Sequence, residues 1–252
     1  MSEKFAWITG ASSGIGEATA IKFAEAGWSL VIAARRIDRL DLLKNKLLEL
    51  GAKTVTPLAL DVRDQDSVAK FTDKAIVETA GRIDVLVNNA GLALGKDPIE
   101  SADWSQLQTM METNVYGVLN VTRSLLPHLR KQISASIIMT GSIAGHQVYE
   151  GGGVYCASKF ALRAITDTLR LELNGSGIKV CSVDPGMVDT EFSLIRLGDA
   201  GSKGVYNGLS PLSGNDIAET IFFVASRPPH VCLNEITIMP TAQASVNKVH
   251  RT

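Results

Sequence analysis

A tyrosine and a lysine stand four residues apart, at Tyr155 and Lys159, and a serine, Ser142, lies upstream of them. Positions i and i+4 share one face of a helix, so the phenol and the ammonium would project to the same side. A phenol titrates near ~10 in water, which is too high for proton transfer at neutral pH. A fixed cation beside it favours the phenolate and lowers that pKa. The spacing therefore indicates a proton-transfer pair, although tyrosine and lysine also share helix faces by chance.

Near the start of the chain, residues 9–16 read Thr-Gly-Ala-Ser-Ser-Gly-Ile-Gly, between an expected strand and an expected helix. Glycine permits a tight turn and lets backbone N–H groups approach a pyrophosphate at a helix N-terminus. The spacing of Gly10, Gly14 and Gly16 is not that of the common dinucleotide fingerprint. A flexible turn is the alternative, but the placement between strand and helix favours phosphate binding.

Two arginines, Arg35 and Arg36, follow the second expected strand. An acidic residue at this point would bind a ribose 2′-hydroxyl and favour NAD, whereas arginine suits a 2′-phosphate. Its planar donors make charge-assisted hydrogen bonds to phosphate. The alternative is a solvated basic pair at the start of a helix. The sequence predicts NADP as the cofactor.

Polar residues also follow later strands. Asp61, with Val62, could accept from an adenine amino group, and the asparagines of 88–91 could tie strand ends together or touch the cofactor. Each of these alone is more often a turn residue. Asn114 lies in an expected long helix, where asparagine is a poor helix former and a buried amide needs partners. A purely structural role is its alternative.

Ser142 lies in Thr-Gly-Ser-Ile-Ala-Gly after the fifth expected strand, so its hydroxyl should face the same cleft as Tyr155. A hydrolase nucleophile would need a histidine base. His146 is the only candidate by position, and we expect it to line the cleft or to be exposed. Cys156 points about 100° away from Tyr155 on a helix and is expected to be a packed small hydrophobe.

Short apolar runs alternate with helical patterns along the chain. Strands are expected at 4–9, 29–34, 55–60, 83–88, 135–140, 179–183 and 235–239, and helices at 16–26, 37–50, 65–80, 104–126, 154–173 and 215–225. This alternation predicts an α/β fold, a Rossmann-like doubly wound parallel sheet of about seven strands with helices on both faces. Ligands bind at the carboxyl ends of such strands, and every motif above falls at one.

The composition is that of an ordinary globular protein, with 252 residues, 45% of them hydrophobic and 20% charged. Because no linker or repeat interrupts it, we expect a single domain over 1–252. The net charge of −1, with scattered Lys and Arg, argues against nucleic-acid or membrane partners. No run approaches the ~20 apolar residues of a membrane helix, and no signal peptide is recognisable. Three widely spaced cysteines suggest no disulfide framework or metal site, and favour the cytoplasm.

Together these segments resemble the short-chain dehydrogenase/reductase family over essentially the whole chain. The matching segments are 9–16, Asn-Asn-Ala-Gly at 88–91, Asn114, Ser142, Tyr-xxx-Lys at 155–159 and Pro-Gly-Met-Val-Asp-Thr at 185–190. Residues 88–95, 190–196 and 239–243 are similar to a narrower group, the NADP-dependent 3-hydroxy acid dehydrogenases, which include serine and L-allo-threonine dehydrogenases and malonic semialdehyde reductases.

The resemblance implies a role for each catalytic residue. Tyr155 would exchange a proton with the substrate oxygen, and Ser142 would hydrogen-bond that oxygen. Lys159 would hold the nicotinamide ribose and lower the Tyr155 pKa, and Asn114 would order a relay water. The implied cofactor contacts are Thr9, Gly10, Ser12, Ser13, Gly14, Ile15, Gly16, Arg35, Arg36, Asp61, Val62, Asn88, Ala90, Gly91, Tyr155, Lys159, Pro185, Gly186, Val188 and Thr190.

The substrate is expected to bind under a lid over about 190–211, which holds Arg196 near its start. A small hydroxy acid needs a cation for its carboxylate, and Arg196 is the candidate; a surface or subunit contact is its alternative. Arg163 is a weaker candidate.

The expected activity is NADP-dependent interconversion of a small 3-hydroxy acid, of the serine, allo-threonine or 3-hydroxypropionate type, and its 3-oxo acid or semialdehyde. The alternatives are reduction of another carbonyl (a 3-oxoacyl thioester, a ketone or a sulfonated aldehyde) and a non-catalytic NADP-binding sensor or scaffold. The resemblance also implies a homotetramer.

Overall fold

The computed structural model describes residues 3–252. Its main sheet holds seven parallel strands in the order β3-β2-β1-β4-β5-β6-β9. These strands are β1 (Phe5–Thr9), β2 (Ser29–Ala34), β3 (Val55–Ala59), β4 (Val85–Asn88), β5 (Ala135–Thr140), β6 (Ile178–Pro185) and β9 (Glu235–Ile238). The strand order reverses between β1 and β4, the kind of switch point where doubly wound sheets bind ligands. The predicted fold is confirmed.

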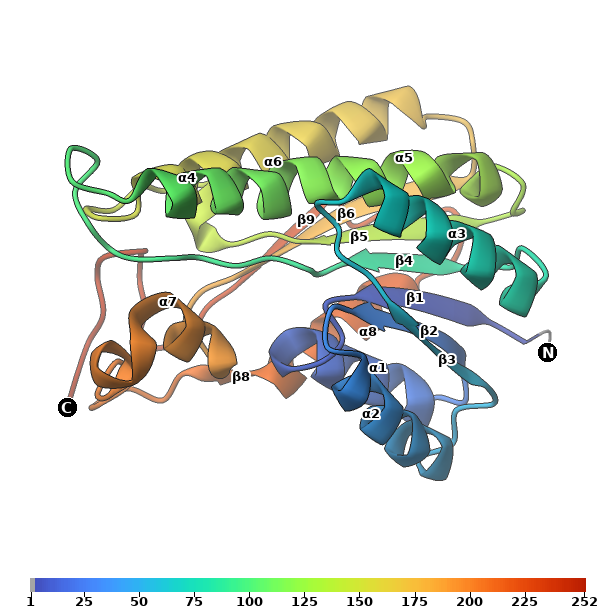
Figure 1. The fold of residues 1–252 in the computed structure, drawn as a ribbon, viewed down its shortest axis with the longest axis horizontal. Helices are drawn as coiled ribbons and strands as arrows, with labels where there is room; N and C mark the ends of the chain where they lie inside the picture. The colour runs from blue at the N-terminus through green and yellow to red at the C-terminus, as the bar shows by residue number, and fades with distance from the viewer. Residues whose placement is uncertain (1–2) are drawn as a thin grey trace.

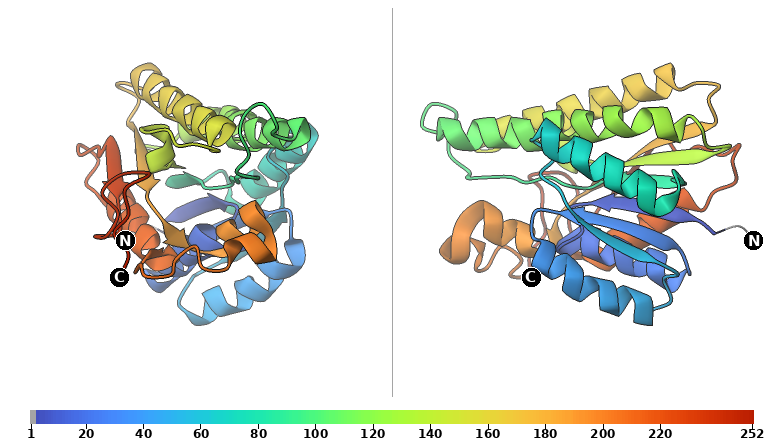
Figure 2. Two further views of the ribbon diagram at one scale, coloured as in Figure 1. Left: turned by 90° about the vertical axis from the view of Figure 1, so that its left-hand side faces the viewer. Right: turned by 45° about the vertical axis from the view of Figure 1, so that its right-hand side comes forward.

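Helices cover both faces of the sheet (Figure 1). On one face lie α1 (Gly14–Glu25), α2 (Ile37–Glu49) and α8 (Gly214–Ala225), and on the other lie α3 (Gln65–Thr79), α4 (Trp104–Met111), α5 (Gly117–Leu129) and α6 (Gly153–Glu172). The left view of Figure 2 looks along the sheet between these two layers.

Of residues 3–252, no helix is both long enough and apolar enough to span a membrane.

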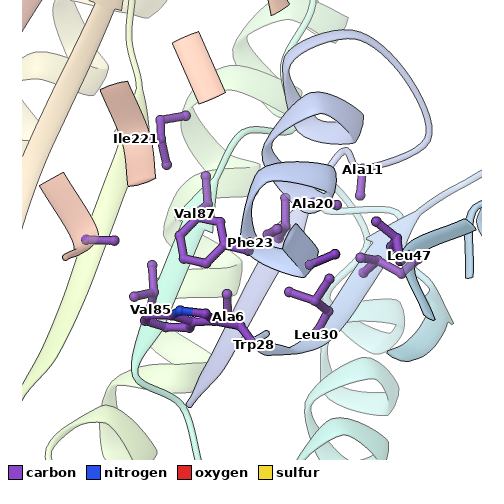
Figure 3. Packing of buried hydrophobic residues seen from close by; sticks show 14 of the residues in the cluster. Ala6, Ala11, Ala20, Phe23, Trp28, Leu30, Leu47, Val85, Val87 and Ile221 are labelled. Carbon is purple, nitrogen blue, oxygen red and sulfur yellow. The ribbon is translucent and has the colours of Figure 1, made fainter. Parts of the chain in front are cut away.

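The strands are apolar throughout because both of their faces are covered. Successive residues of β1 point to opposite faces. Ala6 packs with Phe23 and Trp28 beside α1 (Figure 3), whereas Trp7 packs on Phe71 of α3. The Phe23 and Trp28 rings meet edge to face with centroids 5.0 Å apart. Burial of each large apolar side chain contributes about 1.5–3 kcal/mol to folding stability. This packing holds the strands, and with them the strand ends that carry the site, in fixed positions.

Two segments differ from the predicted elements. The long helix predicted over 104–126 is interrupted by a π-helical turn, Glu112–Tyr116, between α4 and α5. The predicted lid contains a helix, α7 (Glu191–Ser202), in which Gly198 has a φ of 69° and breaks the helix in two. Two short strands, β7 (Val188–Asp189) and β8 (Leu212–Ser213), pair on either side of it. In Figure 1, α7 (orange) stands outside both helix layers.

Candidate active site

A cavity of about 470 Å³, a size typical of small-molecule sites, lies at the carboxyl ends of the strands. Most predicted site residues line it: Gly10, Ser12, Ser13, Gly14, Ile15, Arg35, Arg36, Asp61, Val62, Ala90, Gly91, Ser142, Tyr155, Lys159, Pro185, Gly186, Val188 and Thr190. Five others lie outside the described lining: Thr9, Gly16, Asn88, Asn114 and Arg196. The strand topology thus brings segments that are distant in sequence to one place.

The glycine turn wraps tightly between β1 and α1. Gly10 and Gly14 have φ values of 68° and 58°, which favour glycine. A Cβ on Gly16 would overlap the carbonyl oxygen of Gly10, so this glycine allows the close packing of the turn. Within residues 3–252, the Ser13 side chain caps no N–H group of α1. The first N–H groups of the helix are therefore suited to an anion.

Thr9 and two asparagines hold the strand ends in place. Thr9 Oγ1 accepts hydrogen bonds from the backbone N–H groups of Asn89 (3.0 Å) and Ala90 (3.1 Å). The Asn89 amide donates to the carbonyl oxygen of Thr9 at 3.0 Å. Asn88 is buried and donates to Thr122 Oγ1 at 3.0 Å. These contacts join β1 to β4 and anchor β4 on α5, so the structure gives Thr9 and Asn88 bracing contacts.

The two arginines after β2 differ in their surroundings. Arg35 is exposed, whereas Arg36 is half-buried and folds over the glycine turn. The Arg36 guanidinium donates to Ser13 Oγ at 2.8 Å and to Ser12 Oγ at 3.1 Å. It also pairs with Glu191, at 3.3 Å. A basic group thus lies beside the glycine turn.

Asp61, at the end of β3, is already engaged by a neighbour. Its carboxylate accepts from the Arg63 guanidinium at 2.7 Å, and this hydrogen bond holds the pKa of the carboxyl below its usual value. Both residues line the cavity. The pair places one more cation near Arg35, whose charge also lowers the Asp61 pKa.

Tyr155 and Lys159 lie one turn apart in α6, and both are buried. Lys159 Nζ lies 6.0 Å from the Tyr155 ring centroid and donates to the carbonyl oxygen of Thr140 at 2.9 Å. Burial raises the pKa of Tyr155 to about 12, opposed by a hydrogen bond to Ser142 and by the charge of Arg196. Burial lowers the pKa of Lys159 to about 8, opposed by Asp184. The pKa of Tyr155 is therefore raised and not lowered as predicted, because the effect of desolvation outweighs that of the neighbouring charges.

Ser142 faces the same cavity from the end of β5. Its Oγ accepts from the N–H of Ala144 at 3.1 Å and caps a short 3₁₀ helix, Ile143–Gly145. His146, the candidate base for a hydrolase, instead pairs through Nε2 with Asp184 at 2.9 Å. The geometry therefore favours Ser142 as a hydrogen-bonding group over a nucleophile. Cys156 is buried, as expected of a packed small side chain.

Asn114 lies within the π-helical turn, a feature frequent at functional sites. Its amide donates to the carbonyl oxygen of Leu92 (2.8 Å) and to Ser158 Oγ (3.0 Å), and its oxygen accepts from Leu92 N–H at 2.9 Å. The side chain thus ties the segment after β4 to α6, next to Lys159. The relay water implied by the resemblance stays a prediction.

A buried acid, Asp184, lies behind the lysine at the end of β6. Its carboxylate contacts Ser182 Oγ and His146, and a Cβ on Gly141 would overlap it. It is the neighbouring charge that favours the protonated form of Lys159. Sequence reasoning missed this residue because nothing in the local pattern distinguishes it from other strand-end residues.

Arg196 of α7 reaches back toward Tyr155. Its guanidinium carbon lies 5.5 Å from the Tyr155 ring centroid and 5.3 Å from that of Tyr149. Its Nε donates to the carbonyl oxygen of Gly95 at 3.2 Å. The weaker candidate, Arg163, is bound to Glu235 at 3.0 Å. Tyr155 lines the main cavity together with Ser142, and it lines a second, smaller cavity together with Arg196.

The cavity residues fit a phosphorylated dinucleotide. The glycine turn offers N–H groups for a pyrophosphate, and Arg36 and Arg35 lie beside it. Thr113 also lines the cavity, and its buried hydroxyl has no hydrogen-bond partner among residues 3–252. A buried polar group of this kind needs a partner, which a polar ligand would supply.

The sequence model of the family described as short chain dehydrogenase matches residues 4–195. The chain belongs to this family.

Several members of the short-chain dehydrogenase family resemble the chain along nearly their full length. A sulfoacetaldehyde reductase of Chromohalobacter salexigens is 45% identical over 241 residues, covering 94% of each chain. An NADP-dependent 3-hydroxy acid dehydrogenase of Schizosaccharomyces pombe is 40% identical over 247 residues, 97% of this chain and 95% of that one. A solved closed form of serine dehydrogenase complexed with NADP⁺ superimposes with a TM-score of 0.91 at 35% identity, covering 98% of this chain and 100% of that one.

This protein is therefore a short-chain oxidoreductase that uses a nicotinamide cofactor and acts on CH–OH groups. The result confirms the predicted enzyme class over the non-catalytic sensor or scaffold. The relatives divide between sulfoacetaldehyde reductases and dehydrogenases of 3-hydroxy acids.

Proposed function

We propose that this short-chain dehydrogenase interconverts small 3-hydroxy acids, of the serine, allo-threonine and 3-hydroxypropionate type, with their 3-oxo acids or semialdehydes, using NADP. The observation that carries the proposal is the guanidinium of Arg196, 5.5 Å from the Tyr155 ring centroid. A small hydroxy acid bound with its hydroxyl at Tyr155 would place its carboxylate within reach of this cation. Arginine binds carboxylates through two parallel hydrogen bonds, which would also orient the substrate.

The surroundings of Arg196 support this role over a surface contact. The residue is half-buried, Tyr149 lies against it, and Gly95 accepts from its Nε. Arg196 and Tyr155 both line a smaller cavity of about 20 Å³, and partial burial there would strengthen the attraction of the guanidinium for an anion.

The catalytic groups are assigned as the resemblance implied. When bound, the nicotinamide supplies or accepts the hydride. Tyr155 gives its proton to the carbonyl oxygen in reduction and takes it from the alcohol in oxidation. Ser142 donates a hydrogen bond to that oxygen, where charge develops. Lys159 would hold the ribose hydroxyls, and its positive charge would favour the phenolate.

The choice of NADP rests on Arg35 and Arg36, which line the cavity beside the glycine turn. Two similar proteins carry NADP in their descriptions, which supports the same choice here.

A second candidate substrate is a sulfonated aldehyde. The 45% identical relative is named a sulfoacetaldehyde reductase, and a sulfonate is also an oxyanion that a guanidinium can bind. The two candidates share the anion at Arg196 and differ in the acid group.

We also expect a homotetramer formed through the helices of one face and the C-terminal region. Several large apolar side chains of these helices are exposed, namely Trp104, Tyr116, Phe160 and Leu171. Light scattering coupled to size-exclusion chromatography would measure the mass.

The cytoplasmic location expected from the cysteines stays a prediction.

The test is the initial rate of NADPH formation at 340 nm, with NAD⁺ in parallel wells. The panel comprises L-serine, D-serine, L-allo-threonine, 3-hydroxypropionate, 3-hydroxyisobutyrate and simple secondary alcohols, with sulfoacetaldehyde assayed as NADPH consumption. Turnover of the hydroxy acids with NADP⁺ supports the proposal. Turnover of sulfoacetaldehyde alone selects the second candidate, and turnover of neutral alcohols in preference to every acid contradicts both.

A further inference from the structure

Glu191, the first residue of α7, is paired with two arginines at the start of α2. Its Oε1 lies 2.8 Å from Arg39 NH1, and its Oε2 lies 3.3 Å from Arg36 NH1. Arg39 belongs to α2, whereas Arg36 directly precedes that helix. These two ion pairs connect the lid helix to the segment that follows β2.

Each of the three Arg36 side-chain nitrogens donates to a protein oxygen, although 40% of the side chain is exposed to solvent. Its Nε and NH2 point at Ser12 Oγ, NH2 also donates to Ser13 Oγ, and NH1 donates to Glu191. Arg36 is also the residue proposed to bind a 2′-phosphate. A phosphate that binds the NH1 edge of Arg36 would compete there with the carboxylate of Glu191.

The carboxylate has a second partner that such an exchange would leave in place. Arg39 NH1 contacts both oxygens of Glu191, at 2.8 and 3.0 Å. If Arg36 turns to a phosphate, Glu191 keeps its bifurcated contact with Arg39 NH1. The exchange then replaces one ion pair with another and leaves no charge unpaired.

We propose that Glu191 competes with the 2′-phosphate of the cofactor for Arg36, and so sets how strongly the enzyme favours NADP over NAD. This inference rests on the proposed use of NADP. A dianionic phosphate offers more charge and more acceptors than one carboxylate, and therefore displaces Glu191. The 2′-hydroxyl of NAD carries no charge and leaves the Arg36–Glu191 pair intact.

The competition also links the adenosine end of the cavity to the substrate end. The helix that Glu191 begins carries Phe192 and Ile195, which line the cavity, and then Arg196. The Phe192 and Tyr155 ring centroids are 5.9 Å apart. Loss of the Arg36–Glu191 contact would free the start of the lid helix from one of its two anchors.

The test is isothermal titration of NADPH and NADH into the wild-type protein, Glu191→Gln and Glu191→Asp. Both variants weaken the pair with Arg36, but Glu191→Asp keeps the negative charge on a shorter side chain. We expect NADPH to bind about threefold more tightly to both variants, the scale of a half-exposed ion pair, with NADH affinity unchanged. Glu219→Gln is the matched control, since it removes an exposed carboxylate paired with Lys22 on the surface.

The outcomes separate this inference from the proposed cofactor. Equal wild-type affinities for NADPH and NADH would overturn the NADP preference itself. A wild-type preference for NADPH that is unchanged or reduced in Glu191→Gln would overturn the competition alone. Tighter NADPH binding to Glu191→Gln but not to Glu191→Asp would show simple charge repulsion between Glu191 and the phosphate. An equal gain in affinity for NADPH and NADH would show that Glu191 is a steric barrier. Either result would also overturn the competition.

Discussion

The guanidinium of Arg196 lies 5.5 Å from the ring centroid of Tyr155, although the two residues belong to different helices, α7 and α6. The charge of this arginine is one of two influences that lower the Tyr155 pKa against the effect of burial, the other being Ser142. The proposed substrate anchor and the proton-transfer residue are therefore electrostatically coupled. An anionic substrate at Arg196 would neutralise part of this influence and help to keep the phenol protonated for reduction.

Replacement of Tyr155 by Phe removes the transferable proton and keeps the ring that packs near Phe192. We expect kcat to fall by about 10²- to 10⁴-fold, the usual contribution of a positioned acid or base. The affinity for NADPH, measured by titration, should stay within about twofold of the wild type. Turnover close to that of the wild type would remove Tyr155 from the proton transfer.

Replacement of Arg36 by Ala should raise the Kd of NADPH by about 10- to 100-fold, since it removes charge-assisted hydrogen bonds to the phosphate. The Kd of NADH should change little. Arg35→Ala should have a smaller effect in the same direction, because Arg35 is exposed. Arg227→Ala serves as the control, since this arginine stacks on Phe223. Equal losses for NADPH and NADH would show that Arg36 braces the glycine turn and does not read the phosphate.

Lys159→Met should stabilise the protein near neutral pH at the expense of activity. Burial lowers the pKa of Lys159 from 10.5 to about 8, so below pH 8 folding buries a charged amine. Between pH 8 and 10.5 the unfolded state binds this proton and the folded state does not, so wild-type stability rises with pH in that window.

The difference in unfolding free energy between Lys159→Met and the wild type should therefore be greatest at pH 7, at up to about 3 kcal/mol, and shrink toward pH 10. Urea titrations at several pH values measure it, and the raised Tyr155 pKa, present in both proteins, largely cancels. A difference that does not vary with pH would show that Lys159 is not the titrating group.

Gly16→Ala should disturb the glycine turn without adding strain to the backbone angles. The added methyl group would overlap the carbonyl oxygen of Gly10 and contact the Asn89 amide. We expect the unfolding free energy to fall by about 1–3 kcal/mol, as in other overpacked sites, and the Kd of NADPH to rise at least about tenfold. Gly214→Ala is the comparison, because its methyl group would meet Ala18 Cβ and the Gly14 carbonyl oxygen at 3.3 Å, a tight contact without overlap. Equal effects of the two substitutions would contradict the role assigned to the turn.

The parts of the site that could be predicted from the sequence are those fixed by local pattern. The strand-turn-helix at Gly10 and Gly14 and the spacing of Tyr155 and Lys159 depend on residues close in the chain, and the alternation of apolar runs gave their common edge of the sheet. Most of the predicted cofactor residues consequently line one cavity.

The parts that could not be predicted depend on long-range contacts or on burial. Glu191, Arg39 and Asp184 are ordinary charged residues in sequence, and their partners lie far away along the chain. The interruption of the long helix at Asn114 requires a π-helical turn, which has no simple sequence period. The predicted direction of the Tyr155 pKa shift was wrong, because a sequence can show which charged residues are close to the phenol but not how deeply the phenol is buried.

The most direct test of the account compares 3-hydroxypropionate with its neutral isostere, 3-hydroxypropanamide, as substrates of the wild type and of Arg196→Ala with NADP⁺. Loss of a charge-assisted contact corresponds to about 10- to 100-fold. We predict that the wild type prefers the acid in kcat/KM by at least that factor, that Arg196→Ala loses most of the preference through KM, and that Arg163→Ala keeps it. An equal acid-to-amide ratio in the wild type and Arg196→Ala would contradict the central claim that Arg196 holds the substrate anion beside Tyr155.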